Sequence, residues 1–406
     1  MTITVHGARV VTAVDDSPLE GIDIRIADGR FTSVSPGPVS QGDTAIDGMG
    51  LTFLPGLISA HTHLGGAAMI DADDMPAAMV AAWLFEHLRR SLDLGFTTVR
   101  ETGGTDGGIV QALRSGLVRG PRMLVCGPLL VQTGGHAEFR PAFVPDPCQH
   151  HVGVPGLAVF THPVAGPDAM RAAARLAFKR GATFLKLCIS GGVTSLTDDL
   201  TDTQLSLAEM RAAVEEATAR GTYVTGHAHN NDSIRMGLEA GLKCFEHGSD
   251  VDEETAQQIA RAGAALVPTL TVTHLYKENT SFLPDDVIAR AAGVEDGQRA
   301  AISHGEAAGV LLGCGADLIG PDQRRFGLEL ALVAEEVGAM RAIQISTIDN
   351  ARVLRIADWT GSVEVGKVAD LIAVDGDPLE NPRLLDDPDK VVLVIKDGVI
   401  EKDIRR

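Results

Sequence analysis

The chain has few cysteines, no excess of positive charge and no long apolar run. Its five cysteines are scattered over 406 residues, and none stands in a Cys-x-x-Cys pair, which is typical of reduced thiols in the cytoplasm. Acidic residues outnumber basic ones by 54 to 35, and such a surface repels nucleic acid and anionic membranes. The N-terminus also lacks the basic and apolar regions of a signal peptide. We therefore expect a cytoplasmic protein with neither a nucleic acid nor a membrane as partner.

The composition indicates a folded chain with two kinds of organisation. Charged residues make up 22% and hydrophobic residues 45%, as in globular proteins. Residues 3–50 alternate apolar and polar positions between tight turns, and so do the C-terminal segments 361–364, 369–374 and 391–395. Short strands with tight turns are typical of a β-sandwich. We predict that residues 1–55 and 357–406 pair into one small β-sandwich domain.

The middle of the chain, residues 56–356, alternates strand and helix patterns. Eight segments have the short apolar pattern of buried parallel strands: residues 53–60, 97–101, 122–126, 184–187, 223–225, 244–246, 265–268 and 311–314. Repeated strand–helix units predict a parallel sheet covered by helices, and eight of them favour an α/β fold of the (β/α)8 TIM-barrel type. Residues 127–166 form a long connection, and we expect a functional loop there.

Two histidines end the first strand of this series. His61 and His63 are separated by one residue, so their side chains point to the same face of the strand. Two imidazoles on one face can bind one metal ion. Alone, the pair is equally compatible with polar residues where a strand meets a loop.

Further polar residues stand where other predicted strands end. Lys186 lies in strand four, His227 and His229 end strand five, His247 ends strand six, and Asp317 follows strand eight. A barrel gathers its functional residues at the C-terminal ends of its strands, so we expect these side chains to converge. Neutral imidazoles and a carboxylate suit zinc, manganese or cobalt. Alternation along the strand leaves open whether His227 or His229 is the ligand.

Lys186 has a chemical role that its ammonium form cannot fill. Its apolar strand favours the neutral amine, which can add carbon dioxide to become a carbamate, N6-carboxylysine, with two oxygens that bridge two ions. Two close ions lower the pKa of a shared water. Asp317 would bind one ion, take the proton from that water and pass it to a leaving amine.

Residues 55–63, Pro-Gly-Leu-Ile-Ser-Ala-His-Thr-His, followed by Lys186, His227, His247 and Asp317 in this strand order, resemble the amidohydrolase superfamily. Residues 186–193, Lys-Leu-Cys-Ile-Ser-Gly-Gly-Val, resemble the carboxylated-lysine segment of its prolidase-like branch. This branch includes Xaa-Pro dipeptidases, arginine carboxypeptidases and ochratoxin-type amide hydrolases. The resemblance covers nearly the whole chain, and one departure is Glu101, where many relatives carry aspartate.

The resemblance implies a barrel with a flanking β-sandwich and a homo-oligomeric hydrolase. It implies that a hydroxide bridging two divalent metal ions, zinc being expected, cleaves a peptide or N-acyl amino acid bond. It favours His227 as the strand-five ligand and leaves His229 near the substrate, while His136 is expected to bind the substrate or the reacting carbonyl. The implied ligands are His61, His63, Lys186, His227, His247 and Asp317.

Two other functions compete with amide hydrolysis. A mononuclear deaminase or cyclic-amide hydrolase would commonly carry glutamate three residues beyond the strand-five histidine, where this chain has Asn230, and would lack Lys186. A non-catalytic metal-binding protein is the other alternative, although no site residue is missing.

Three segments are expected to line the pocket: the loop 127–166, the segment 188–203 and the loop 269–284. Their residues Phe139, Arg140, Phe143, His274 and Tyr276 are compatible with a partly apolar, carboxylate-bearing ligand. Residues 198–199, Asp-Asp, are interpreted as a solvated loop.

Overall fold

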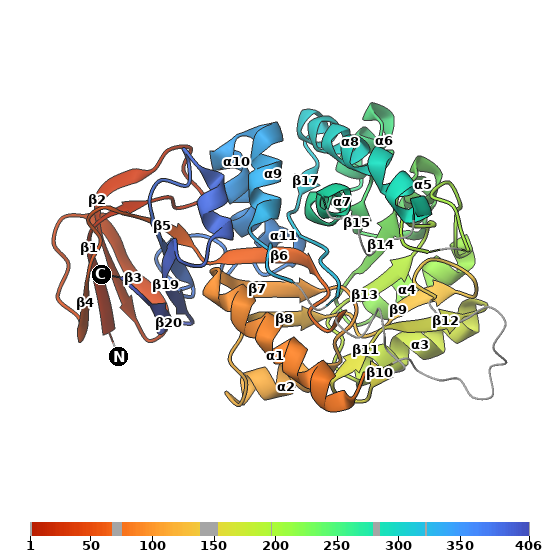
Figure 1. The fold of residues 1–406 in the computed structure, drawn as a ribbon, viewed down its shortest axis with the longest axis horizontal. Coiled ribbons are helices and arrows are strands. Elements are labelled where there is room, and N and C mark those ends of the chain that lie inside the picture. Colours follow the sequence, from red (N-terminus) through yellow and green to blue (C-terminus); the bar gives the residue numbers. More distant parts are fainter. Residues whose placement is uncertain are drawn as a thin grey trace.

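The computed structural model describes residues 2–66, 75–138, 153–195, 197–278, 285–320 and 323–405. A mixed sheet built from both chain ends lies on one side, and parallel strands covered by helices form the larger part (Figure 1). Among the described segments, each helix is too short or too polar to span a bilayer.

The mixed sheet contains eight strands in the order β20-β19-β18-β5-β1-β2-β3, with β4 beside β1. Their bounds are β1 Thr2–Val10, β2 Leu19–Ala27, β3 Arg30–Pro36, β4 Thr44–Asp47, β5 Leu51–Pro55, β18 Leu371–Asp375, β19 Val391–Lys396 and β20 Val399–Asp403. Antiparallel pairing of β5 with β18 places Leu54 opposite Ile372. The two ends of the chain therefore lie in one sheet. Residues 361–364 are not a strand, because Gly361 has φ 93° and this residue turns the chain.

The parallel strands form a three-stranded sheet, β6-β7-β8, and a seven-stranded sheet, β12-β9-β13-β14-β15-β16-β17. Their bounds are β6 Leu57–Thr62, β7 Phe96–Glu101, β8 Arg122–Val125, β9 Leu129–Gln132, β12 Thr161–Val164, β13 Leu185–Cys188, β14 Val224–Ala228, β15 Cys244–His247, β16 Ala265–Val267 and β17 Leu311–Leu312. The Thr183 N–H donates to Val125 O and the Ala60 N–H donates to Cys314 O, both at 2.8 Å. These two bonds join the sheets on both sides, and the α/β class with parallel strands is confirmed.

Helices alternate with these strands. They are α1 Ala77–Asp93, α2 Gly107–Arg114, α3 Pro167–Lys179, α4 Leu207–Thr218, α5 Asn231–Ala240, α6 Glu253–Arg261, α7 Leu270–Glu278, α8 Asp285–Ala308, α9 Leu328–Val337, α10 Ala339–Gln344 and α11 Asn350–Val353. Local chemistry sets several starts: Ser206 and Glu209 form a capping box on α4, and the Asn230 side chain accepts the Ser233 N–H at the start of α5. Side-chain acceptors at these positions satisfy helix N–H groups that have no partner inside the helix.

Three further predicted segments differ from the structure. The expected strand 53–60 is two strands in different sheets, because the Gly56 N–H turns to Asp370 O. The connection 127–166, expected to be a long functional loop, contains β9, β12 and the short pair β10 Gly153–Val154 and β11 Ala158–Val159 in its described part. Residues 269–284 were expected to be a loop, yet α7 begins at Leu270.

Candidate metal centre

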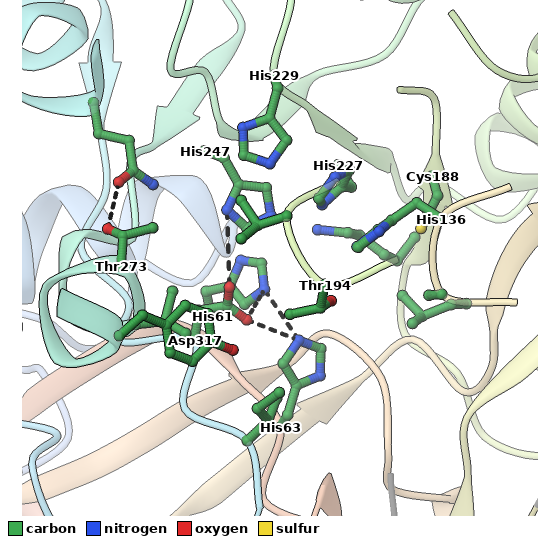
Figure 2. Close-up of a pocket in the computed structure, with 18 residues that line it drawn as sticks. His61, His63, His136, Cys188, Thr194, His227, His229, His247, Thr273 and Asp317 are labelled. Carbon is green, nitrogen blue, oxygen red and sulfur yellow. Dashed lines mark hydrogen bonds and ion pairs between the residues drawn. The ribbon is translucent and has the colours of Figure 1, made fainter. Parts of the chain in front are cut away.

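One cavity, partly open to solvent, lies at the C-terminal ends of the parallel strands. All eight residues predicted for the site line it, and Figure 2 shows the labelled histidines gathered around Asp317. They are His61, His63, His136, Lys186, His227, His229, His247 and Asp317.

Asp317 holds the centre of the cluster. Its Oδ1 lies 3.1 Å from Nε2 of His61 and 3.0 Å from Nε2 of His63, and its Oδ2 lies 3.9 Å from Nδ1 of His247. One ligand atom from each of His61, His247 and Asp317 falls within 4.8 Å of the other two. Imidazole nitrogens and a carboxylate oxygen at this spacing can hold a divalent ion.

The imidazoles of His61, His63 and His247 each have one ring nitrogen engaged by a hydrogen bond. Nδ1 of His61 meets Glu246 Oε2 at 2.8 Å, Nδ1 of His63 meets Gly103 O at 2.7 Å, and Nδ1 of His247 meets Thr269 Oγ1 at 2.7 Å. These contacts orient the rings and leave Nε2 of each for a ligand. Such outer contacts are typical of metal-binding histidines.

The backbone at two of these residues is unusual. His247 has φ 71° and Asp317 has φ 53°, in the left-handed region that favours glycine. Residues held in this region concentrate at functional sites.

The charge states suit metal binding. Burial lowers the pKa of His227 and His247 well below the usual value, and lowers the pKa of His229 to about 3. Burial would raise the pKa of Asp317, but the neighbouring His61 and His63 hold it well below its usual range. The imidazoles of His227, His229 and His247 are therefore neutral beside an ionised carboxylate. Burial would lower the pKa of His63, but its contact with Asp317 raises that pKa above the usual value.

Lys186 has an unsatisfied amine. The side chain is 2% exposed, and its Nζ has no hydrogen-bond partner among the described residues. An unpaired polar atom at this depth is costly. The histidines and Asp317 that line the same cavity are suitable ligands for a divalent ion, and a carboxylate on Lys186 could bridge such ions.

Glu246 and Arg100 form a charged pair beneath the cluster that the sequence patterns did not assign to the site. Both are fully buried, and Arg100 Nη2 donates to Glu246 Oε1 at 2.7 Å. Burial raises the pKa of Glu246, but Arg100 outweighs it and holds that pKa well below its usual range. The only sequence signal was a charged residue inside an apolar strand.

His136 lies against His227, with ring centroids 4.0 Å apart and planes inclined by 20°. A Cβ on Gly192 would lie 2.2 Å from Nδ1 of His136, so glycine is needed for the ring to approach the backbone.

The remaining pocket predictions have mixed outcomes. Tyr276 lines the cavity with Leu129, Val193 and Val272, whereas His274 contacts Glu295 instead. Phe139, Arg140 and Phe143 lie outside the described residues. The described wall is therefore largely apolar around a polar base.

Comparisons with known proteins agree with this geometry. The model of the amidohydrolase family matches residues 52–400, and the ochratoxinase of Aspergillus niger is 28% identical over 370 residues, covering 86% of this chain and 75% of the relative. The crystal structure of a prolidase complexed with N-methylphosphonate-L-proline has a TM-score of 0.94 and 33% identity, covering 99% and 100% of the two chains. A Xaa-Pro dipeptidase with bound methionine in the active site has a TM-score of 0.89 and 29% identity, with the same coverage. The chain therefore belongs to the prolidase-like branch of the amidohydrolase superfamily and hydrolyses carbon–nitrogen amide bonds.

Proposed function

We propose that the protein cleaves dipeptides or N-acyl amino acids with two divalent ions, zinc being the expected metal. The observation that carries this proposal is the buried Lys186 amine, which has no partner among the described residues and lines one cavity with the histidines and Asp317. As N6-carboxylysine it would supply two anionic oxygens, enough to bridge two ions. Such a bridge would give Nζ of Lys186 a bonding partner and a function in metal binding, which an unmodified ammonium group lacks.

Six residues would hold the ions. They are His61, His63, N6-carboxylysine at Lys186, His227, His247 and Asp317. When bound, two divalent ions polarise a carbonyl and lower the pKa of water. Asp317, ionised and in contact with His61 and His63, would move a proton from the attacking water to the leaving amine.

His227 is our choice for the strand-five ligand. The resemblance to the family supports this choice. The Nε2 of His227 contacts Gly191 O at 3.2 Å, so each of the two histidines has one ring nitrogen engaged. His229 instead contacts Ser249 Oγ through Nδ1, at 2.9 Å, and we place its ring beside the substrate. His136, on the other side of His227, also faces the substrate.

The proposed activity is tested with a library of dipeptides and N-acyl amino acids, with metal analysis of the same preparation. We expect amine release from several members and two divalent ions per active chain. Aminated heterocycles serve as the comparison set. Ammonia released from these, with no cleavage of the amide library, would contradict the proposal, and so would metal binding with no turnover.

The architecture supports further proposals. We assign β6, β7, β8, β13, β14, β15, β16 and β17 to a (β/α)8 barrel of residues 56–356, and residues 1–55 and 357–406 to a β-sandwich domain. The bonds that join the parallel sheets on both sides support the barrel. We also propose a cytoplasmic homo-oligomer; the four described cysteines are free and buried, which suits a reducing compartment. Light scattering tests the assembly, and a monomer at working concentration would contradict it.

A further inference from the structure

We infer that a groove at the N-terminal ends of the parallel strands binds a small organic carboxylate through Arg220 and Arg355. Phe184 and Tyr223 line this groove and directly precede β13 and β14, whereas His227 of the metal centre lies near the far end of β14. The strand from Tyr223 to His227 spans about 13 Å. Binding in the groove therefore does not depend on the proposed amide hydrolysis.

The wall of the groove is apolar. Leu124, Phe178, Phe184, Tyr223 and Leu354 contribute to it, and the groove has a volume of about 410 Å³. Phe184, Tyr223 and Leu354 are buried and belong to the apolar cluster that fills this end of the parallel strands. The space and the wall suit a small molecule with an apolar body.

Each arginine stacks its guanidinium on an aromatic ring of this wall. Cζ of Arg220 lies 4.7 Å from the ring centroid of Phe178, and Cζ of Arg355 lies 4.8 Å from that of Tyr223. Stacking uses the face of a guanidinium and leaves the N–H groups at its edge free to donate. Such an edge binds a carboxylate through two parallel hydrogen bonds.

The groove has no anion of its own to neutralise these charges. Neither Arg220 nor Arg355 forms an ion pair within the described parts of the chain, and the described residues that line the groove include no carboxylate. Glu216 is within electrostatic reach of Arg220, but its Oε1 already lies 2.7 Å from Nη2 of Arg175. Two positive charges therefore face the groove in a chain whose net charge is −19.

The backbone of Arg355 is a second, independent observation. Arg355 follows α11 with φ 61°, and its N–H donates to Arg352 O while the Ile356 N–H donates to Ala351 O. This pair of bonds is the Schellman pattern of a helix end, in which glycine is favoured at the left-handed position. An arginine is less stable than glycine in this conformation, which points to a role for its side chain.

Isothermal titration calorimetry of the zinc-loaded full chain tests the site with 3-phenylpropanoate, which joins a carboxylate to an apolar ring. We expect this compound to bind, and 3-phenylpropanamide, which lacks the charge, to bind at least about tenfold more weakly because charge-assisted hydrogen bonds are lost. Inorganic phosphate, which lacks the apolar body, should also bind more weakly. Equal or tighter binding of either comparison compound would overturn the inference.

Two substitutions locate the binding site. Arg220→Gln removes one guanidinium, and Arg355→Gly removes the other while placing at φ 61° the residue that adopts this conformation most readily. We expect each to weaken 3-phenylpropanoate binding at least about tenfold, and Arg355→Gly to unfold at a temperature no lower than the natural chain. If Arg355→Gly unfolds earlier, Arg220→Gln alone decides. Binding that survives the substitutions lies elsewhere, for example at the metal centre, and would overturn the inference.

Arg211→Gln is the matched control. Arg211 lies in α4, the helix that leads to Arg220, and pairs with Glu239 at the surface. This substitution removes the same charge from the chain, and Arg211 is not part of the groove. We expect it to keep the natural affinity for 3-phenylpropanoate. An equal loss of affinity in this control would show that net charge attracts the carboxylate, and would overturn the inference.

Discussion

At the scale of single residues, Glu246 is the hub beneath the cluster of histidines. It accepts hydrogen bonds from His61 and Arg100, at 2.8 and 2.7 Å, and from the Thr225 hydroxyl. Arg100 in turn donates to Ala60 O and lies 3.4 Å from the Tyr223 hydroxyl. The negative charge of Glu246 therefore lies behind His61, a predicted metal ligand. There it orients the imidazole ring and makes the ring more basic.

Glu246→Gln removes this charge while keeping the shape of the side chain. Arg100 would then be buried without its counter-ion, and we expect unfolding free energy to fall by about 3–5 kcal/mol. Metal affinity should fall by about 10–100-fold, because His61 loses the acceptor that orients it. Denaturant unfolding and competition with a chelator measure the two effects.

The control for this substitution is Glu239→Gln. Glu239 pairs with Arg211 at 3.0 Å on the surface, and exposed pairs contribute about 0–1 kcal/mol. If Glu246→Gln has the same unfolding free energy and the same metal affinity as this control, the role assigned to Glu246 is contradicted.

The rule that functional residues gather where parallel strands end, together with the resemblance to the family, predicted eight residues for the site, and all eight line one cavity. His61, His247 and Asp317 end or follow apolar segments, Lys186 lies inside one, and parallel strands bring such positions together. Glu246 and Arg100 escaped it because their partners come from different strands, and no local spacing records a pairing across 146 residues. Residues 198–199 were interpreted as a solvated loop, which is wrong for Asp198: it is buried and accepts a hydrogen bond from the Ser195 hydroxyl at 2.6 Å, and a polar loop looks the same in sequence whether it is buried or exposed.

At the scale of elements, α7 forms one wall of the cavity and depends on a buried carboxyl group. Glu329 in α9 accepts the backbone N–H groups of Leu270 and Thr271, at 3.0 and 2.7 Å. This caps the start of α7, whose residues Val272 and Tyr276 line the cavity. The helix was not predicted because its anchor lies 58 residues away.

Glu329 gives the protein a testable pH dependence. Burial raises its pKa to about 7, and its backbone donors only partly offset this. The unfolded chain releases this proton near pH 4.5 and the folded chain near pH 7, so the folded state binds more protons between these values and stability falls as the pH rises through them. Relative to Glu329→Gln, the natural chain should lose up to about 3 kcal/mol of unfolding free energy between pH 4 and pH 8.

Denaturant unfolding of both chains across this pH range measures the difference and cancels the other titrating groups. A constant difference between Glu329→Gln and the natural chain would contradict the raised pKa. A difference that grows in favour of the natural chain with rising pH would contradict its sign.

The division of the expected strand 53–60 also belongs to this scale. Residues 53–60 are apolar except for Pro55, Gly56 and Ser59, and the Pro-Gly pair is the sequence signal that marks the division between β5 and β6. The break follows from contacts with distant residues: β5 pairs with β18, and Leu57 donates to Gly95 O.

At the scale of the whole molecule, the mixed sheet ties the two ends of the chain together. Phe53 of β5 and Ile395 of β19 are fully buried in the same apolar cluster. The expected pairing of the chain ends was readable from their shared alternating pattern. The order of the strands in the sheet could not be predicted from the sequence, because several strand orders are compatible with the same alternating pattern.

Phe53→Ala tests this connection. Removing a fully buried phenylalanine should lower unfolding free energy by about 3–5 kcal/mol, with unchanged metal content at low temperature. The matched control, Val399→Ala on β20, removes a side chain that is 53% exposed and should cost less than about 0.5 kcal/mol. Equal stability of the two variants would show that the sheet core is not shared as described.

The most direct test of the account is the number of metal ions bound by the natural chain and by Lys186→Ala, both purified with zinc and bicarbonate. The account predicts two ions per natural chain, and in Lys186→Ala fewer than two ions with kcat/KM reduced by at least about 100-fold. Two ions and full activity in Lys186→Ala, or fewer than two ions in an active natural chain, would contradict it.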